Sequence, residues 1–383
     1  MKTNKLFILG LSVLSILFTN CDNKDETTSS QNEFNFGATV ARNFKGKIVD
    51  ENNNPIANAT VTLNGYEVVT NSSGIFSYVN ASVKERFAYF TAKKEGFLNG
   101  SRTVMTHDGL NELTIMLLTP KVDMIQAGEI STVTVGNTSI KFDGAFTTES
   151  GEVYNGTVKV LSADLPANDP KVFDKMPGSL LAIDSNGNYK GLETFGMVNV
   201  ELYGSDNQKL QLTEGHTAKI TMDIATQAQQ AIAPNVMPMW YFDVKKGVWV
   251  EEGFSERIGN KYVGNVSHFT VWNNDWAYPV ATLNVVVTNA DGTPVQGVKV
   301  EIFRPSVTAP ADHWNVPLIS LGTTGSNGTL SAGVPYNEVF VFRAYNVNGI
   351  LINTQELPAS TLANRTVYVV IPFNDRVATT KKN

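Results

Sequence analysis

The sequence predicts an all-β protein built from tandem Greek-key or immunoglobulin-like β-sandwich domains, and three observations lead to this fold class. Asn (38 residues) and Gly (30 residues) are abundant, and both tolerate the positive φ of tight turns. Apolar and polar residues alternate with period two in many short segments, as in half-buried strands. One strand–turn–strand pattern occurs twice. Helix is expected only in residues 224–232, which Pro234 would end.

The size and charge of the chain bound its organisation and partners. Its 383 residues correspond to two or three domains at roughly 150 residues each. The net charge of −6 excludes a bulk electrostatic attraction to nucleic acid or anionic lipid, so no nucleic-acid partner is expected. The single cysteine excludes an intrachain disulfide and a Cys-based zinc site.

Residues 1–20 have the pattern of an export signal. Lys2 and Lys5 precede an apolar stretch, residues 6–18, whose length as a helix would be about 20 Å, short of a ~30 Å hydrocarbon core. Cys21 follows directly. Its position resembles the cleavage and lipidation site of bacterial lipoproteins, which implies that Cys21 becomes the acylated N-terminus. An ordinary buried thiol is the alternative.

Residues 21–42 are expected to form a flexible tether, because residues 22–32 are too polar to pack. Lys24-Asp25-Glu26 resembles the acidic tag that exports Bacteroidetes-type lipoproteins to the outer face of the outer membrane; a plain solvated linker is the alternative. The resemblance implies a lipid-anchored outer-membrane protein that faces the extracellular side, with the membrane as its partner through acyl chains.

An internal repeat organises the rest of the chain. Residues 48–63 align without a gap to residues 287–302, each with a strand, a turn, Pro, a β-branched residue and a second alternating strand. Residues 70–77 then align to residues 324–331, where a turn with Gly leads into another strand. The two motifs are farther apart in the second copy than in the first, so the second copy carries an insertion between them.

Residues 43–119 resemble the carboxypeptidase regulatory-like domain, a small transthyretin-like Greek-key sandwich. The matching positions are Pro55, Ile56, Ala59, Val61, Gly74 and Phe76. The resemblance implies this fold and no activity, because the module is non-catalytic in the enzymes that it accompanies. Residues 280–378 are expected to be a looser relative.

Residues 120–279 are expected to form a central β-rich domain. Three sequence segments resemble the β-rich region of cartilage intermediate layer proteins and of many bacterial surface proteins. They are residues 192–197, 238–253 and 266–273. That resemblance implies no enzymatic role.

No motif in the sequence predicts a catalytic, metal or cofactor site. The four histidines are His107, His216, His268 and His313, and none lies in a zinc-peptidase motif. His268 is interpreted as a hydrogen-bonded structural residue, with a ligand as the alternative. Residues 184–188 have oxygen ligands at alternate positions, as a calcium loop has, but a two-residue Asn-Gly hairpin turn is the favoured interpretation.

Aromatic residues supply the candidate ligand contacts. Trp240 and Trp272 alternate with apolar neighbours and are expected in a core. Trp276 lies at an expected domain junction, and it is a better candidate for an exposed contact residue than Trp240 or Trp272. His313 and Trp314 lie in the proline-rich insertion at 303–318, which is expected to be a loop; contact with a ligand and packing on a neighbouring domain are equally compatible with it.

The leading hypothesis is therefore a non-catalytic cell-surface lipoprotein that displays β-sandwich domains for binding or adhesion to a glycan, a protein or another cell. A carbohydrate-binding accessory protein of a polysaccharide-uptake system and a structural component of the envelope are alternatives. A hydrolase is a fourth hypothesis, since distant residues can form a triad. The ligand and the oligomeric state stay open.

Overall fold

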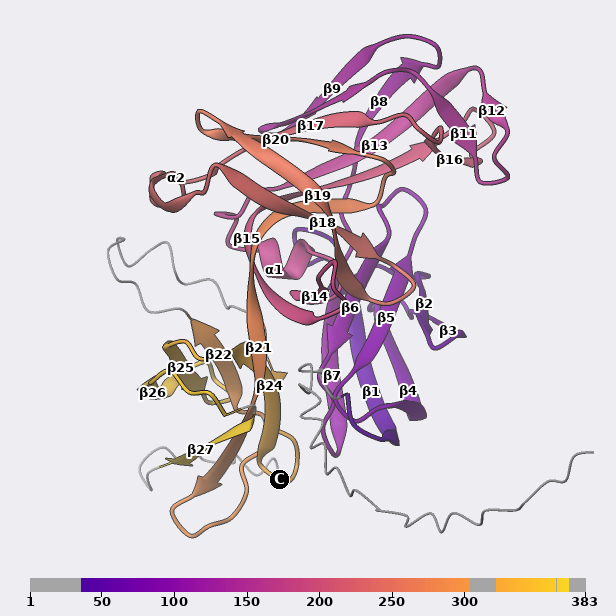
Figure 1. Ribbon diagram of the computed structural model, residues 1–383. Coiled ribbons are helices and arrows are strands. Elements are labelled where there is room, and N and C mark those ends of the chain that lie inside the picture. The colour runs from indigo at the N-terminus through magenta and orange to yellow at the C-terminus, as the bar shows by residue number, and fades with distance from the viewer. Residues whose placement is uncertain (1–35, 304–321, 363, 372–383) are drawn as a thin grey trace, which may run out of the picture. The chain divides into compact units, whose positions relative to one another are not determined.

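The computed structural model describes residues 36–303, 322–362 and 364–371, and it is an all-β structure, as predicted (Figure 1). Its two short helices in these ranges are α1 (Val172–Lys175) and α2 (Gln227–Ile232). Helix α2 lies in the predicted helical segment, whereas the single turn α1 was not predicted. No helix within the described residues has the length and apolar character needed to cross a membrane.

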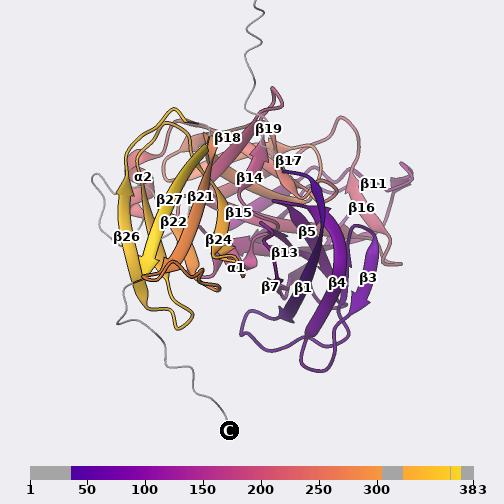
Figure 2. The same ribbon diagram turned by 90° about the horizontal axis from the view of Figure 1, so that it is seen from below.

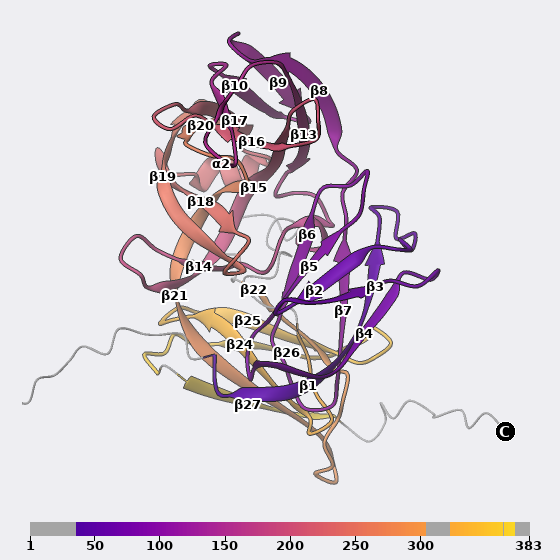
Figure 3. The ribbon, with the colours of Figure 1, turned by 90° about the vertical axis from the view of Figure 1, so that its right-hand side faces the viewer.

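The first sandwich consists of two sheets, with strand orders β4-β1-β7 and β3-β2-β5-β6 (Figure 3). Strands β1 and β7 pair in parallel, while the other neighbours are antiparallel. The seven strands are β1 (Thr39–Val49), β2 (Thr60–Leu63), β3 (Tyr66–Val69), β4 (Ile75–Lys84), β5 (Ala88–Lys93), β6 (Gly100–Val104) and β7 (Leu110–Met116). Strand β1 thus begins before residue 43, where the predicted domain starts.

The C-terminal sandwich has the same strand order as the first. Its sheets are β24-β21-β27 and β23-β22-β25-β26, and β21 and β27 again pair in parallel (Figure 2). The strands are β21 (Val271–Asn289), β22 (Lys299–Phe303), β23 (Gly322–Thr323), β24 (Thr329–Pro335), β25 (Phe340–Tyr345), β26 (Leu351–Leu357) and β27 (Asn364–Ile371). The sequence repeat is therefore also a repeat of topology.

A buried threonine performs the same task in both copies. Thr70 Oγ1 donates to Ile56 O (2.8 Å) and accepts from Ala59 N (2.9 Å). In the second copy, Thr324 Oγ1 donates to Val295 O (2.7 Å) and accepts from Val298 N (3.0 Å). Each threonine satisfies backbone groups that lose water on folding, which explains why it recurs at this point of the repeat.

The glycine of the second repeat motif also has a structural reason. Gly74 and Gly328 both have φ of +71°, a conformation that side chains disfavour. A Cβ at Gly74 would press against Ile48 O, and one at Gly328 against Val287 O. Both turns therefore need glycine for close approach as well as for dihedral freedom.

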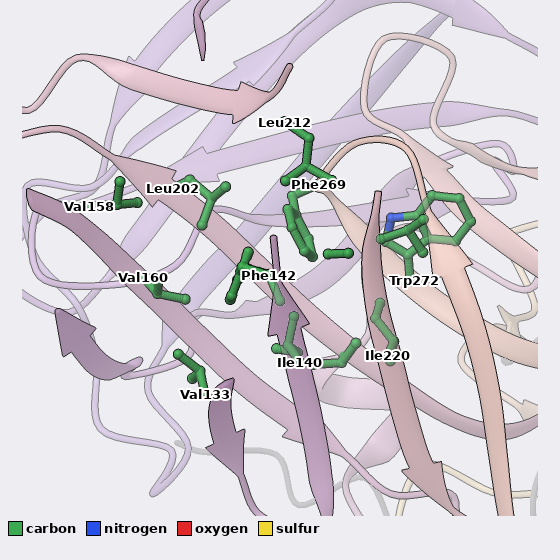
Figure 4. Close-up of a cluster of buried hydrophobic side chains, with 14 of the residues drawn as sticks. Val133, Ile140, Phe142, Val158, Val160, Leu202, Leu212, Ile220, Phe269 and Trp272 are labelled. Atoms are coloured by element: carbon green, nitrogen blue, oxygen red, sulfur yellow. The ribbon is translucent and has the colours of Figure 1, made fainter. Parts of the chain in front are cut away.

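The central region packs its strands around a large apolar core (Figure 4). Phe142 and Phe269 lie with ring centroids 5.3 Å apart in this core, next to the buried Trp272. Its strands are β8 (Lys121–Gln126), β9 (Ser131–Val135), β10 (Thr138–Phe142), β11 (Phe146–Thr148), β12 (Val153–Tyr154), β13 (Thr157–Leu165), β14 (Leu181–Ile183), β15 (Tyr189–Tyr203), β16 (Lys209–Leu212), β17 (Ala218–Asp223), β18 (Val236–Asp243), β19 (Val248–Ile258) and β20 (Lys261–Val266).

Strand β21 belongs to both the central region and the C-terminal sandwich (Figure 1). Its first half pairs with β15 and β18, and from Val280 onward it pairs with β24 and β27. The predicted boundary between residues 279 and 280 therefore falls inside one continuous strand, where the pairing partners change. The domain boundaries themselves stay a prediction.

The first sandwich shares a hydrophobic cluster with the central region. Leu98 and Met116 of the sandwich pack in one buried cluster with Leu165, Trp240 and Trp249. The described residues, from Phe36 onward, belong to one compact unit. The sandwiches in this unit are therefore joined by apolar packing and by a shared strand.

We expect Thr70→Val to lower the free energy of unfolding by about 1–3 kcal/mol, because the isosteric side chain leaves Ala59 N and Ile56 O buried without their partner. Thr324→Val should have a comparable effect in the second copy. Urea unfolding measures both. Thr114→Val, at an exposed position of β7, is the control; equal stability of all three variants would contradict this account.

Candidate functional site

Trp276 is the predicted contact residue that the structure describes, and its side chain is 45% exposed. It lies on β21, directly opposite Glu193 of β15 in the antiparallel register. Opposite positions in such a pair bring their Cβ atoms to about 5 Å. The exposed indole of Trp276 therefore lies next to the carboxyl-bearing side chain of Glu193. The pairing of β21 with β15 fixes the position of the indole.

The residues before Trp276 form a buried polar strip, Asn273, Asn274 and Asp275, with exposed fractions of 0%, 2% and 0%. Asn273 Nδ2 donates to Asp275 Oδ2 (2.7 Å), and Asn274 Oδ1 lies 2.6 Å from Ser255 Oγ. Trp240 Nε1 donates to Asp275 O (3.1 Å). These residues lie near the start of β21, where β15 and β18 flank the strand on both sides.

Asp275 is a buried carboxylic acid. Burial raises the pKa of Asp275 well above its ordinary value, and hydrogen bonds from Thr194 and Phe195 act in the opposite direction as smaller effects. Asp275 Oδ1 and Asn273 Oδ1 are buried without a hydrogen-bond partner in the described part of the chain. A retained proton would let the carboxyl group donate as well as accept a hydrogen bond in this strip.

His268 has structural partners. Its ring packs edge-on against Tyr241, with centroids 4.7 Å apart, and its carbonyl accepts from Trp272 Nε1 (2.9 Å). His268 Nε2 lies 3.5 Å from Glu252 Oε2. These contacts agree with the interpretation of His268 as a structural residue.

The other described histidines serve local contacts on the surface. His216 Nδ1 lies 2.6 Å from Asp143 Oδ2, and His107 Nδ1 lies 2.8 Å from Asp108 O. Within the ranges that the structure covers, no three His, Cys, Asp or Glu side chains gather as metal ligands would.

Residues 184–188 form a hairpin turn between β14 and β15, as favoured from the sequence. Asp184 N donates to Asn188 O (2.9 Å), so the turn closes over three residues and not over the predicted two. Asp184 Oδ1 accepts from Asn186 N (3.0 Å) and Asn188 N (2.8 Å). The carboxylate of Asp184 thus holds the turn itself.

The remaining candidates divide into two groups. Trp240 and Trp272 are fully buried, which confirms their expected place in a core. Cys21, His313 and Trp314 lie outside the described residues, so their roles stay predictions. Sequence reasoning missed the buried strip before Trp276; three consecutive polar residues between two tryptophans were its one signal.

Comparisons with known proteins find similarity among solved structures. No family model and no curated protein sequence matches the chain. Among solved structures, it is similar to the Bacillus anthracis TIE protein (11% identity, TM-score 0.19), covering 87% of this chain and half (50%) of that one. It is also similar to the major pilin SpaD from Corynebacterium diphtheriae (9%, TM-score 0.19, 89% and 99% covered). A DUF3823 family protein from Bacteroides ovatus is a third (6%, TM-score 0.16, 84% and 100% covered).

We expect the free energy of unfolding to depend less on pH in the Asp275→Asn variant. The folded-state pKa of Asp275 is raised, so its contribution is complete below about pH 4, the unfolded value, and declines as pH rises toward the folded pKa. An amide lacks this titration. Urea unfolding between about pH 4 and 8 measures the difference.

Asp206→Asn, which changes an exposed turn residue, is the matched control and should keep the slope of the unmodified chain. If Asp275→Asn kept that slope too, Asp275 would not be the buried acid described above.

Proposed function

We propose that the chain is a non-catalytic lipoprotein of the cell surface whose β-sandwich scaffold presents side chains to a glycan or a protein. The observation that carries this proposal is the exposure of Trp276 on a strand whose other tryptophan, Trp272, is fully buried. Large apolar side chains held in the open on rigid strands are frequent contact residues, because little conformational entropy is lost when they bind.

The neighbourhood of Trp276 favours a carbohydrate among the possible ligands. An indole face packs against the C–H groups of a sugar ring, and the opposite Glu193 places a carboxyl group beside it. This supports the second candidate function, an accessory protein of a polysaccharide-uptake system.

The module assignment forms part of the same proposal. We infer that residues 43–119 are a carboxypeptidase regulatory-like domain. Two sheets with one parallel pair, and the turn glycine Gly74 with its required positive φ, support this inference. Such a module would act as a rigid spacer and support.

The cellular location of the protein is proposed from the sequence. Acylated Cys21 would anchor the chain in the outer membrane, and the polar tether would carry the sandwiches to the extracellular side. Two or more acyl chains hold a protein firmly, at about 0.8 kcal/mol for each buried CH₂ group.

Trp276→Ala should weaken binding to a glycan that the unmodified chain retains by about tenfold, because it removes the exposed indole. A panel of immobilised glycans, followed by titration of the best binder, measures this. Tyr66→Ala removes another exposed aromatic side chain (75% exposed) and is the control. Equal affinity of both variants and the unmodified chain would refute the contact role of Trp276.

Cys21→Ser should abolish acylation, so that the chain is released from membranes or retains its signal segment. Membrane fractionation and metabolic labelling with a fatty-acid analogue measure the two effects. Unchanged fractionation together with unchanged labelling would disprove the anchor.

A further inference from the structure

A basic groove lies where the first sandwich meets the central region. It has a volume of about 600 Å³ and is lined by the turn after β5 and by the outer faces of β13 and β15. Lys93, Lys94 and Lys159 line it, with Glu95 as the one acidic lining residue. The whole chain has a net charge of −6, so this surface has the opposite sign to the molecule around it.

Within the part of the chain that the structure describes, the three ammonium groups are not neutralised by ion pairs. Among the described residues, none of them lies within ion-pair distance of a carboxylate. Lysines on an acidic protein that keep no acidic partner leave their charge available to a ligand.

Two of the lysines are held in place by neutral partners. Lys159 Nζ donates to Asn207 Oδ1 (2.8 Å) and lies 5.6 Å from the centroid of the Tyr203 ring. Lys94 Nζ donates to Asn58 O (3.3 Å). An ammonium group has three donors, so each lysine retains donors for an anion while its position is already restricted.

Glu201, which bonds to the groove residues Asn99 and Tyr203, has both of its carboxylate oxygens occupied. Glu201 Oε1 accepts from Asn99 N and Asn99 Nδ2 (both 3.0 Å), and Glu201 Oε2 accepts from the Tyr203 hydroxyl (2.6 Å). This network joins the turn of the first sandwich to β15 and so fixes the width of the groove. Burial, followed by the bond to Glu201, raises the pKa of Tyr203, so the ring stays neutral beside Lys159.

The pairing of the strands disfavours an extended acidic peptide as the ligand of this groove. β13 pairs with both β8 and β15, and β2 and β5 are likewise paired on both sides, so these strands offer no free backbone edge to an extended peptide. At these three strands, recognition must therefore come from side chains. Amides such as Asn58 and Asn207 can pair with hydroxyl groups, and Met124, opposite Lys159 in the register, adds an apolar surface.

We propose that this groove binds an acidic polysaccharide, with Lys94 and Lys159 contacting its carboxylate or sulfate groups. The site is separate from the surface around Trp276 and goes beyond the function proposed above. The negative charge of this ligand distinguishes it from a neutral glycan, and the lysines, which form no ion pairs, select for that charge. The amides of the groove recognise its hydroxyl groups.

The experiment titrates the full chain in mild detergent with polygalacturonate, which carries carboxylates, with dextran sulfate and with neutral dextran. We expect binding to one or both polyanions, weaker at higher salt, and none to dextran. Binding to polygalacturonate would identify carboxylates as the recognised groups, and binding to dextran sulfate would identify sulfates. Absence of binding to both polyanions would overturn the proposal, and would leave the glycan contact at Trp276 unaffected.

Matched variants test the site itself. Lys94→Gln combined with Lys159→Gln should weaken binding by about tenfold or more, since charged hydrogen bonds are lost. Lys141→Gln combined with Lys219→Gln removes the same charge from exposed, paired positions on β10 and β17 and should leave affinity unchanged. Lys94→Arg with Lys159→Arg should retain binding.

Two results would refute the groove as a polysaccharide site. Equal losses in both glutamine pairs would show a non-specific response to net charge. Poly-glutamate that binds as tightly as the polysaccharide, and through the same two lysines, would show that the ligand is an acidic peptide.

Discussion

Strand β21 is the constraint on which most of the structure depends, because one backbone segment completes the sheets of two regions. Its first half is hydrogen-bonded to β15 and β18, and its second half to β24 and β27. A one-residue shift would turn every side chain of both halves to the opposite face. The register of the central region and that of the C-terminal sandwich are therefore set together, and Trp276 is held at the position where the two meet.

The polar strip beside Trp276 gives this register its specificity. Asn273, Asn274 and Asp275 are buried, and burying polar groups is costly unless they find partners. The bond from Ser255 of β19 to Asn274 forms only when β19, β18 and β21 are aligned as in the native structure, whereas the bond between Asn273 and Asp275 lies within β21 itself. A shifted alignment would leave Asn274 and Ser255 buried without this bond, so the strip disfavours other registers more than it adds stability.

The sequence was most informative where the signal is local. Period-two alternation, the turn glycines Gly74 and Gly328 and the aligned motifs predicted sandwiches whose strand orders agree. Local patterns did not reveal the burial of residues 273–275, since a run of Asn and Asp is typical of exposed turns and its tertiary partners are not visible in the sequence. The groove was out of reach for a related reason: Lys94, Lys159 and Tyr203 are distant in sequence and meet only through packing between the regions.

That packing also explains why a groove can be specific on an otherwise open β surface. Leu98, between the groove residues Phe97 and Asn99, is buried in the cluster that the first sandwich shares with the central region. The turn carrying Lys94 is thus anchored by apolar burial on one side and by the bond from Asn99 to Glu201 on the other. Because its position is fixed before any ligand arrives, little ordering remains to oppose binding, and the spacing between Lys94 and Lys159 can discriminate among polyanions.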